Sequence, residues 1–287
     1  MKVSRSLTIQ GVPVPAFFYG TAWKEDRTEE LVKLALTSGF AAIDTANQRR
    51  HYVEPAVGAA VVGRKREELF LQTKFTYAGG QDHRIPYDPR ADPATQVRQS
   101  FESYLEHLQT TYVDSYILHG PSARHGLSET DEQVWRTMQA LHGAGKARLI
   151  GASNVSLDQL IDLHRLDGTK PAFVQNRCFA TTLWDGEVRE FCRAHGIAYQ
   201  GFSLLTANAQ EIQKSAIDRI AQRAGRTCAQ VVFRFALQAG MIPLTGTSSA
   251  AHMREDLGAF DFELTDAEAQ AVERVGWFSG QPPTPRL

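Results

Sequence analysis

The sequence predicts an α/β protein in which eight parallel strands, each followed by a helix, close into a (β/α)8 TIM barrel. Eight short apolar runs are each followed by a segment with helical spacing of apolar residues. Such alternation implies parallel pairing, and about 250 residues is the usual size of this barrel. A doubly wound open sheet is the competing fold. It is disfavoured because no Gly-x-Gly-x-x-Gly motif follows the first strand and because polar residues follow nearly every strand.

Length and composition fit one such barrel. The chain has 287 residues, 43% of them hydrophobic, and no stretch resembles a linker, so we expect a single domain over residues 1–287. The net charge of −1 gives no support for binding to nucleic acid or to an acidic membrane. We therefore expect a small-molecule partner and a monomer or weak homo-oligomer.

The cysteines and the N-terminus predict a cytoplasmic protein. Cys178, Cys192 and Cys228 are odd in number, far apart and without a Cys-x-x-Cys pair, which favours neither a disulfide framework nor a metal site. The first ten residues lack the apolar core of a secretory signal. No apolar run approaches the roughly 20 residues that span a membrane.

The eight predicted strands are short, apolar and spread over the whole chain. In order, they cover residues 17–19, 40–43, 69–73, 113–118, 149–150, 172–174, 197–199 and 241–244. Apolar runs on both sides of Gly11 precede the first strand and predict a short N-terminal β-hairpin over residues 7–14.

Helical patterns lie between these strands, and several have recognisable ends. They cover residues 29–37, 54–61, 92–108, 132–142, 156–163, 187–195, 216–224 and 228–239. Gly39 and Gly143 follow two of them as helix-ending glycines, and Ser156 is placed to cap a third. A Pro-rich segment at 281–285 predicts an irregular tail.

Polar side chains follow the second, third and fourth strands where each strand ends. Asp44, Lys74 and His119 hold these positions, and Tyr52 lies in the loop after Asp44. Because the carboxyl ends of barrel strands meet at one rim, we expect these four side chains to converge there. Asp44 alone would be equally consistent with an ordinary acid at a strand end or helix cap.

With these residues in place, the chain resembles the aldo-keto reductase family over nearly its whole length. The similarity rests on Gly20-Thr21, residues 39–58, Phe70-Leu71-Gln72-Thr73-Lys74, residues 113–121, Gly151-Ala152-Ser153-Asn154, and residues 171–175, 199–205 and 246–257. It implies an enzyme that reduces an aldehyde or ketone to an alcohol with hydride from NADPH or NADH, and without a metal.

The resemblance also implies a role for each residue at the predicted rim. Tyr52 would protonate the carbonyl oxygen, and the Lys74 ammonium would lower the pKa of this phenol from its ordinary value of about 10. Asp44 would pair with Lys74. His119 would donate a hydrogen bond that orients the carbonyl and stabilises its developing negative charge.

The proton donor stays open between two neighbouring residues. The family places its Tyr five residues after the Asp, where this chain has Arg49, so the loop is longer here. Counting back from Val57-Gly58 leaves Tyr52 and His51 on either side of the expected position. We favour Tyr52 because the resemblance supports a Tyr; the His51 imidazole, with an ordinary pKa of about 6.5, is the alternative.

The same resemblance implies a cofactor site. Ser153, Asn154 and Gln175 would hold the nicotinamide carboxamide, and Phe202 would stack on the ring in place of the commoner Tyr. A short helix after the final strand would reach Glu255 and Asp256. The contacts to ribose, pyrophosphate and adenosine would come from Thr21, Asp44, Ser203, Leu205, Thr245, Gly246, Thr247, Ser248, His252, Glu255 and Asp256. The alternative for Ser153 and Asn154 is that they only cap the following helix.

NADP(H) is favoured over NAD(H), although the basic residues are fewer than usual. Many relatives carry a Lys-Ser pair after the last strand, where this chain has Leu244-Thr245. His252 and Arg254 lie close enough in sequence to meet the 2′-phosphate of NADP(H), and Ser248 offers a hydrogen-bond donor.

The substrate pocket is expected to contain Trp23, Tyr77 and His119, together with the loop at 121–130. Trp23 has an alternative place in the core, where an isolated Trp usually lies. The C-terminal lid of many relatives is short or absent in this sequence, which predicts an open site for bulky or varied carbonyl compounds.

Two other functions stay open from the sequence. A barrel lyase or aldolase would use Lys74 as a Schiff-base nucleophile. A non-catalytic relative would bind a nicotinamide cofactor as a redox-sensing module.

Overall fold

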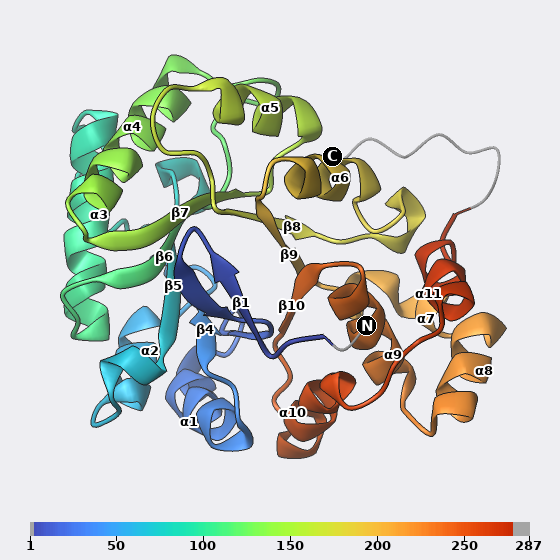
Figure 1. Ribbon diagram of the computed structural model, residues 1–287. Helices are drawn as coiled ribbons and strands as arrows, with labels where there is room; N and C mark the ends of the chain where they lie inside the picture. The colour runs from blue at the N-terminus through green and yellow to red at the C-terminus, as the bar shows by residue number, and fades with distance from the viewer. Residues whose placement is uncertain (1–2, 278–287) are drawn as a thin grey trace.

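The computed structural model describes residues 3–277, which form a closed barrel of eight parallel strands (Figure 1). The strands are paired in the order β10-β3-β4-β5-β6-β7-β8-β9. They are β3 (Phe18–Gly20), β4 (Ala42–Asp44), β5 (Phe70–Phe75), β6 (Val113–Leu118), β7 (Ala147–Ser153), β8 (Phe173–Arg177), β9 (Ala198–Phe202) and β10 (Met241–Thr245). Each predicted strand overlaps one of these, so the predicted fold class is confirmed. The predicted tail at 281–285 and any C-terminal lid lie outside the described residues.

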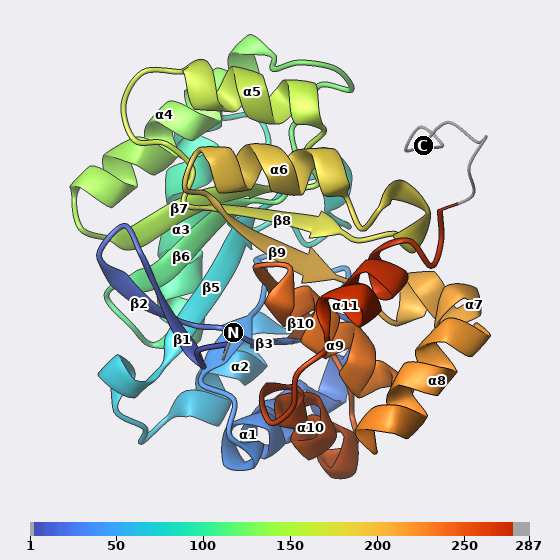
Figure 2. The same cartoon turned by 45° about the vertical axis from the view of Figure 1, so that its right-hand side comes forward.

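Helices surround the barrel and connect its strands (Figures 1 and 2). They are α1 (Thr28–Ser38), α2 (Glu54–Val61), α3 (Pro93–Leu108), α4 (Glu129–Gly143), α5 (Leu157–Arg165), α6 (Gly186–Ala194), α7 (Ala209–Ile212), α8 (Ser215–Ala224), α9 (Cys228–Gln238), α10 (Ala250–Leu257) and α11 (Asp266–Glu273). The sequence patterns did not predict α7 and α11. A capping box formed by Thr265 and Glu268 marks the start of α11, and this signal was readable in the sequence.

The residues predicted to end or cap three helices do so in the structure, with one exception. Gly39 ends α1 in the left-handed conformation, with φ of 111°, and Ser156 caps α5 in a capping box with Gln159. Gly143 is the last residue of α4, but the left-handed turn after this helix is made by Gly145. The boundary was therefore predicted correctly, and the residue that makes the turn was not.

The N-terminal hairpin lies across the amino-terminal end of the barrel (Figures 1 and 2). It consists of β1 (Ser6–Ile9) and β2 (Val12–Pro15), paired antiparallel. Its buried side chains, Ile9, Val12 and Val14, pack in one cluster with interior barrel residues such as Phe70 and Phe173. Because this end is filled by apolar side chains, the polar interior lies toward the opposite, carboxyl end of the strands.

Helices α2 and α3 are in close backbone contact at Gly58. A Cβ atom at this position would lie 1.9 Å from the backbone oxygen of His107 on α3. Only glycine fits here, because real Cβ atoms do not approach other atoms so closely. This contact fixes α2, whose first turn follows the loop that carries Tyr52.

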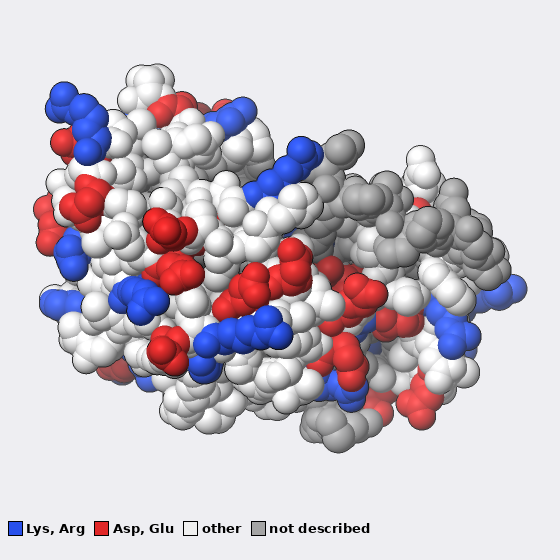
Figure 3. Space-filling view, turned by 90° about the horizontal axis from the view of Figure 1, so that it is seen from above, with Lys and Arg blue, Asp and Glu red and all other residues white. Residues whose placement is uncertain are grey.

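One face of the molecule shows no large patch of a single charge among the residues that the structure describes (Figure 3). On the face shown in Figure 3, acidic and basic side chains are interspersed over the described residues. Among residues 3–277, none of the helices is both long and apolar enough to cross a lipid bilayer.

Candidate active site

A cavity of about 1280 Å³ opens at the carboxyl end of the barrel. Residues at or just after every barrel strand line it, among them Gly20, Asp44, Thr76, His119, Ser153, Gln175, Phe202 and Thr245. Pockets for a single drug-sized ligand usually measure about 300 to 1,000 Å³. The cavity is therefore large enough for more than one small molecule at once.

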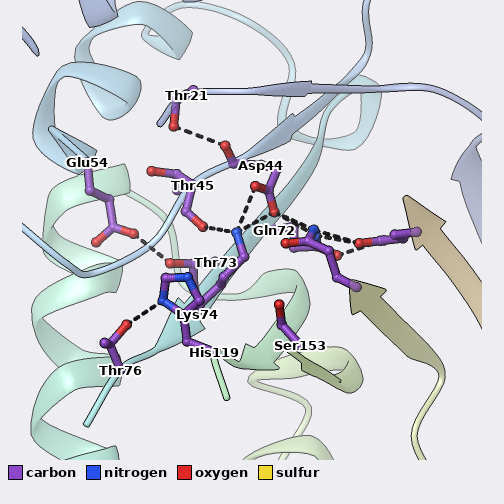
Figure 4. Close-up of polar contacts among 12 residues, drawn as sticks. Thr21, Asp44, Thr45, Glu54, Gln72, Thr73, Lys74, Thr76, His119 and Ser153 are labelled. Carbon is purple, nitrogen blue, oxygen red and sulfur yellow. Dashed lines mark hydrogen bonds and ion pairs between the residues drawn. The ribbon is translucent and has the colours of Figure 1, made fainter. Parts of the chain in front are cut away.

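A buried ion pair lies under this cavity. The Lys74 side chain is 1% exposed, and its Nζ lies 2.6 and 2.7 Å from the two carboxylate oxygens of Asp44 (Figure 4). Nζ also donates to the backbone oxygen of Thr45 at 2.9 Å. Burial lowers the pKa of Lys74, and the Asp44 carboxylate opposes this shift.

Three glutamines surround the acid of this pair inside the barrel. Oδ1 of Asp44 accepts hydrogen bonds from Nε2 of Gln72 at 2.7 Å and of Gln175 at 3.0 Å. Both of these Nε2 atoms also donate to Oε1 of Gln200, each at 2.8 Å. Because both amide protons of Gln175 are engaged in this way, its Oε1 is the atom left to accept a hydrogen bond from a ligand.

Tyr52 and His51 lie in different surroundings. The Tyr52 ring meets the His119 ring edge to face, with centroids 6.1 Å apart, and its centroid lies 5.4 Å from Nζ of Lys74. His51 instead stacks on Trp23 with centroids 3.8 Å apart. Trp23 is 68% exposed and lines the cavity, so its alternative placement in the core is wrong.

The direction of the Tyr52 pKa shift differs from the prediction. Burial raises the pKa of the Tyr52 phenol above its ordinary value, and the negative charge of Asp44 raises it further. These two effects outweigh the lowering expected from the Lys74 ammonium, which is paired with Asp44 at hydrogen-bond distance. Tyr52 therefore holds its proton over the whole working pH range, as a proton donor must before it reacts.

His119 is neutral in this site. Burial lowers the pKa of His119 to about 3, and the charges of Lys74 and His51 act in the same direction. Its Nδ1 lies 2.7 Å from the Thr76 hydroxyl (Figure 4). Its backbone oxygen accepts from Nδ2 of Asn154 at 2.8 Å. A neutral imidazole has one N–H, so His119 offers a hydrogen-bond donor without a charge.

Most of the predicted ligand-binding residues lie on the cavity wall. These are Trp23, Asp44, Tyr52, Tyr77, His119, Ser153, Asn154, Gln175, Phe202, Ser203, Leu205, Thr245, Gly246, Thr247, His252, Glu255 and Asp256. Lys74 lies beneath the wall. Thr21 is fully buried and its hydroxyl donates to the Asp44 backbone oxygen, whereas Ser248 is exposed and outside the wall, so neither faces the cavity.

The helix-capping alternative for Ser153 and Asn154 is wrong. Ser156 supplies the α5 cap, whereas Nδ2 of Asn154 donates to the backbone oxygen of His119 and to Oγ of Ser153. Asn154 also has a positive φ of 53°, which asparagine tolerates better than most residues. Its side chain thus ties β7 to the end of β6.

The far end of the cavity lies between β10 and α10. Asp256 accepts a hydrogen bond from the Thr245 hydroxyl at 2.8 Å, and burial raises the pKa of Asp256 to about 6. His252 lines the cavity, whereas Arg254 is exposed and outside its wall. The Lys24 ammonium donates to the backbone oxygen of Gly246 at this end.

Several residues of the site were missed in the sequence. Thr76 and Arg177 follow Lys74 and Gln175 by two residues, and both line the cavity, so the strand-end rule would have found them. Gln72 and Gln200 lie within strands at inward-facing positions, where no motif singled them out. Within residues 3–277, His, Cys, Asp and Glu side chains do not gather in threes as a metal site requires.

Comparisons with known proteins agree with one another. A family model described as "Aldo/keto reductase family" matches residues 17–276. A glyoxal reductase of Bacillus subtilis is 29% identical over 274 residues, covering 93% of this chain and 92% of the relative. An aldo-keto reductase of Mycolicibacterium vanbaalenii is 32% identical over 247 residues, covering 85% and 82%. The crystal structure of an aldo/keto reductase from Brucella melitensis has a TM-score of 0.81 at 25% identity, covering 95% of this chain and 99% of that one.

Proposed function

Because the chain belongs to the aldo/keto reductase family, we propose that it reduces an aldehyde or ketone to an alcohol with a nicotinamide cofactor and with Tyr52 as the proton donor. One observation carries the proposal. The buried Asp44–Lys74 pair lies beside Tyr52 and His119, beneath a cavity large enough for a cofactor and a substrate.

The polar groups of the cavity fit a nicotinamide. Oε1 of Gln175 is left as an acceptor for a carboxamide N–H, Ser153 lies beside it on the wall, and Phe202 offers an aromatic face. NADP(H) is the favoured cofactor and NAD(H) the alternative, with His252 as the basic residue of the wall nearest the proposed adenosine end. When bound, the nicotinamide would supply the hydride.

The residues of the chain have separate tasks in this proposal. The Tyr52 hydroxyl holds the proton that the carbonyl oxygen receives. The neutral His119 donates a hydrogen bond to the same oxygen and favours its developing negative charge. Lys74 keeps a positive charge next to the tyrosinate that remains after proton transfer, and Asp44 holds Lys74 in place.

The burial of Lys74 argues against a Schiff-base lyase. Its Nζ is held by Asp44 and Thr45 and does not line the cavity, so a substrate carbonyl has no direct path to it. A non-catalytic redox sensor is disfavoured because the complete proton-donating group is present beside the cavity.

The substrate is proposed to include small dicarbonyl compounds as well as bulkier carbonyls. Similar proteins are named glyoxal reductase and methylglyoxal reductase. The exposed Trp23–His51 stack at the cavity wall offers an aromatic surface for larger groups. We further propose that the protein acts in the cytoplasm as a monomer or weak homo-oligomer; its three cysteines are free thiols, which suits a reducing compartment.

The test is a panel of aldehydes and ketones, including glyoxal and methylglyoxal, followed by loss of NADPH or NADH absorbance. Tyr52→Phe removes only the hydroxyl, so we expect reduction to fall by about 10²- to 10⁴-fold while cofactor affinity is kept. His51→Gln should be mild. Near-normal activity of Tyr52→Phe, together with loss of activity in His51→Gln, would assign the proton to the imidazole instead.

A further inference from the structure

We propose that the Thr76 hydroxyl fixes the tautomer of His119, so that Nε2 carries the ring proton and is the donor to the substrate carbonyl. The catalytic consequence rests on the proposed function. The hydrogen bond itself is a property of the chain alone and can be tested without turnover. Thr76 would thus be a positioning residue that acts through His119.

The position of Thr76 follows from strand register. Phe75 at the end of β5 pairs with Leu118 at the end of β6, so the next residues of the two strands, Thr76 and His119, emerge side by side. Oγ1 of Thr76 lies 2.7 Å from Nδ1 of His119 (Figure 4). Thr76 is only 6% exposed, and His119 is partly buried at the cavity wall.

The orientation of the Thr76 side chain is fixed by its neighbours. Its methyl carbon occupies the space over Gly80, where a Cβ atom would lie only 2.8 Å away. Its backbone oxygen accepts hydrogen bonds from the Tyr87 hydroxyl at 2.8 Å and from Nε2 of Gln81 at 3.4 Å. With the methyl group against Gly80, the hydroxyl is left facing the imidazole.

Counting protons selects one tautomer. His119 is neutral, because burial lowers the pKa of His119 to about 3, so it has one ring N–H. If that proton were on Nδ1, the Thr76 hydroxyl would accept it, and its own buried proton would have no acceptor among the described residues. If the proton is on Nε2, the hydroxyl donates to Nδ1 and both groups are satisfied. The cost of an unsatisfied buried group corresponds to a bias of about 5- to 150-fold.

The Thr76 hydroxyl is the hydrogen-bond partner of the imidazole at Nδ1. Tyr52 meets the His119 ring edge to face, with centroids 6.1 Å apart, and Lys74 Nζ donates to Asp44 and Thr45. Removal of the Thr76 hydroxyl therefore takes away the donor that holds the lone pair on Nδ1, and the Nδ1–H tautomer becomes accessible.

The direct test is long-range ¹H–¹⁵N NMR on labelled protein, which separates the two neutral tautomers of a histidine. The chain has 9 histidines, so His119→Gln serves to assign the His119 signals. We expect the Nε2–H tautomer in the unchanged protein and in Thr76→Ser, which keeps the hydroxyl. Thr76→Val keeps the shape but loses the hydroxyl, and the Nδ1–H tautomer should appear. Thr137→Val, at a buried threonine on α4 whose hydroxyl donates to Gln133, is the matched control and should change nothing at His119.

Turnover provides the second measurement. For Thr76→Val we expect kcat/KM for the carbonyl substrate to fall by roughly ten-fold or more, below the 10²- to 10³-fold loss that removal of a whole oxyanion donor causes. Cofactor affinity should stay unchanged, and Thr76→Ser should recover most of the loss.

Three results would overturn the inference. These are Nδ1–H in the unchanged protein, an unaltered tautomer in Thr76→Val, or an altered tautomer with unchanged kcat/KM. If the unchanged protein reduces no carbonyl compound, the proposed function fails instead, while the NMR spectra still decide whether Thr76 sets the tautomer.

Discussion

The two ends of the cavity are built differently. At the end near β4 to β8, Asp44, Lys74 and Gln175 are buried and each makes at least two hydrogen bonds of 3.0 Å or less. At the end near α10, His252 is exposed, and its Nδ1 lies 3.5 Å from the Thr247 hydroxyl. The chemical end is therefore preorganised, whereas the far end, apart from the buried Thr245–Asp256 hydrogen bond, is adaptable at His252. This contrast indicates that reaction rate and cofactor choice can be changed separately.

The largest effect is expected from a substitution that removes the ion pair at the preorganised end of the cavity. Lys74→Met keeps the length of the side chain but removes the charge beside Tyr52, so reduction should fall by about 10²- to 10⁴-fold. The Asp44 carboxylate would then be buried without its partner, which usually costs about 3 to 5 kcal/mol of stability. Circular dichroism melting and steady-state rates measure the two effects.

A matched control shows whether the effect comes from the loss of this buried lysine or from the loss of any lysine charge. Lys33→Met, on the exposed side of α1 where Lys33 pairs with Glu29, should leave rate and melting temperature nearly unchanged. If Lys74→Met kept near-normal turnover in a folded protein, the ion pair would be structural and the comparison between the two ends would lose its basis.

A smaller effect is expected at the adaptable end. If His252 meets the 2′-phosphate, His252→Ala should weaken NADPH binding by about ten-fold and leave NADH binding unchanged. This value is at the lower end for a contact to a charged group because the site is exposed. Arg254→Ala should do less, since Arg254 lies outside the cavity wall. Fluorescence titration with both cofactors measures this; equal losses for NADPH and NADH would show that His252 does not recognise the phosphate.

The smallest effect concerns stability at the same end. The pKa of Asp256 is raised to about 6 by burial, from an ordinary value of 3.8, so the folded state binds this proton more tightly than the unfolded state. The stability that this group contributes is present at low pH and is lost as the pH rises from about 4 to 6. Asp256→Asn keeps an acceptor for Thr245 and avoids the buried charge.

We therefore expect Asp256→Asn to stabilise the protein at pH 8 by about 1 to 3 kcal/mol and to have little effect near pH 3, below the ordinary pKa of the carboxyl. Differential scanning calorimetry at the two pH values tests this. A stabilisation that is the same at both would point to packing instead of the charge.

The barrel was predictable because its signals are local and repeated. Each strand is a short apolar run with a polar residue at its end, so Asp44, Lys74 and His119 were found by one rule applied along the chain. Gln72 and Gln200 were not found, because an inward-facing polar residue within a strand is recognised only when its partner across the barrel is known. Their mutual hydrogen bonds join residues 128 positions apart in sequence.

The pKa shift of Tyr52 shows a second limit of the sequence. A cation next to a phenol predicts a lower phenol pKa, but the sequence contains no measure of how far the phenol is buried or of how close the Asp44 carboxylate lies to it. Both quantities depend on distances in the folded chain, and together they reverse the predicted direction. The types of residue at this site were thus predictable from the sequence, whereas the direction of the Tyr52 pKa shift was not.

The close contact at Gly58 has a consequence for mutational drift. Every single-base change in a glycine codon that alters the amino acid adds a Cβ atom, and here that atom would lie 1.9 Å from the His107 backbone oxygen. Even alanine would push α2 away from α3 and displace the loop before it, which holds Tyr52. In a saturation library selected for activity, position 58 should therefore be as depleted of variants as position 44 or 74, although its residue has no chemical group to contribute.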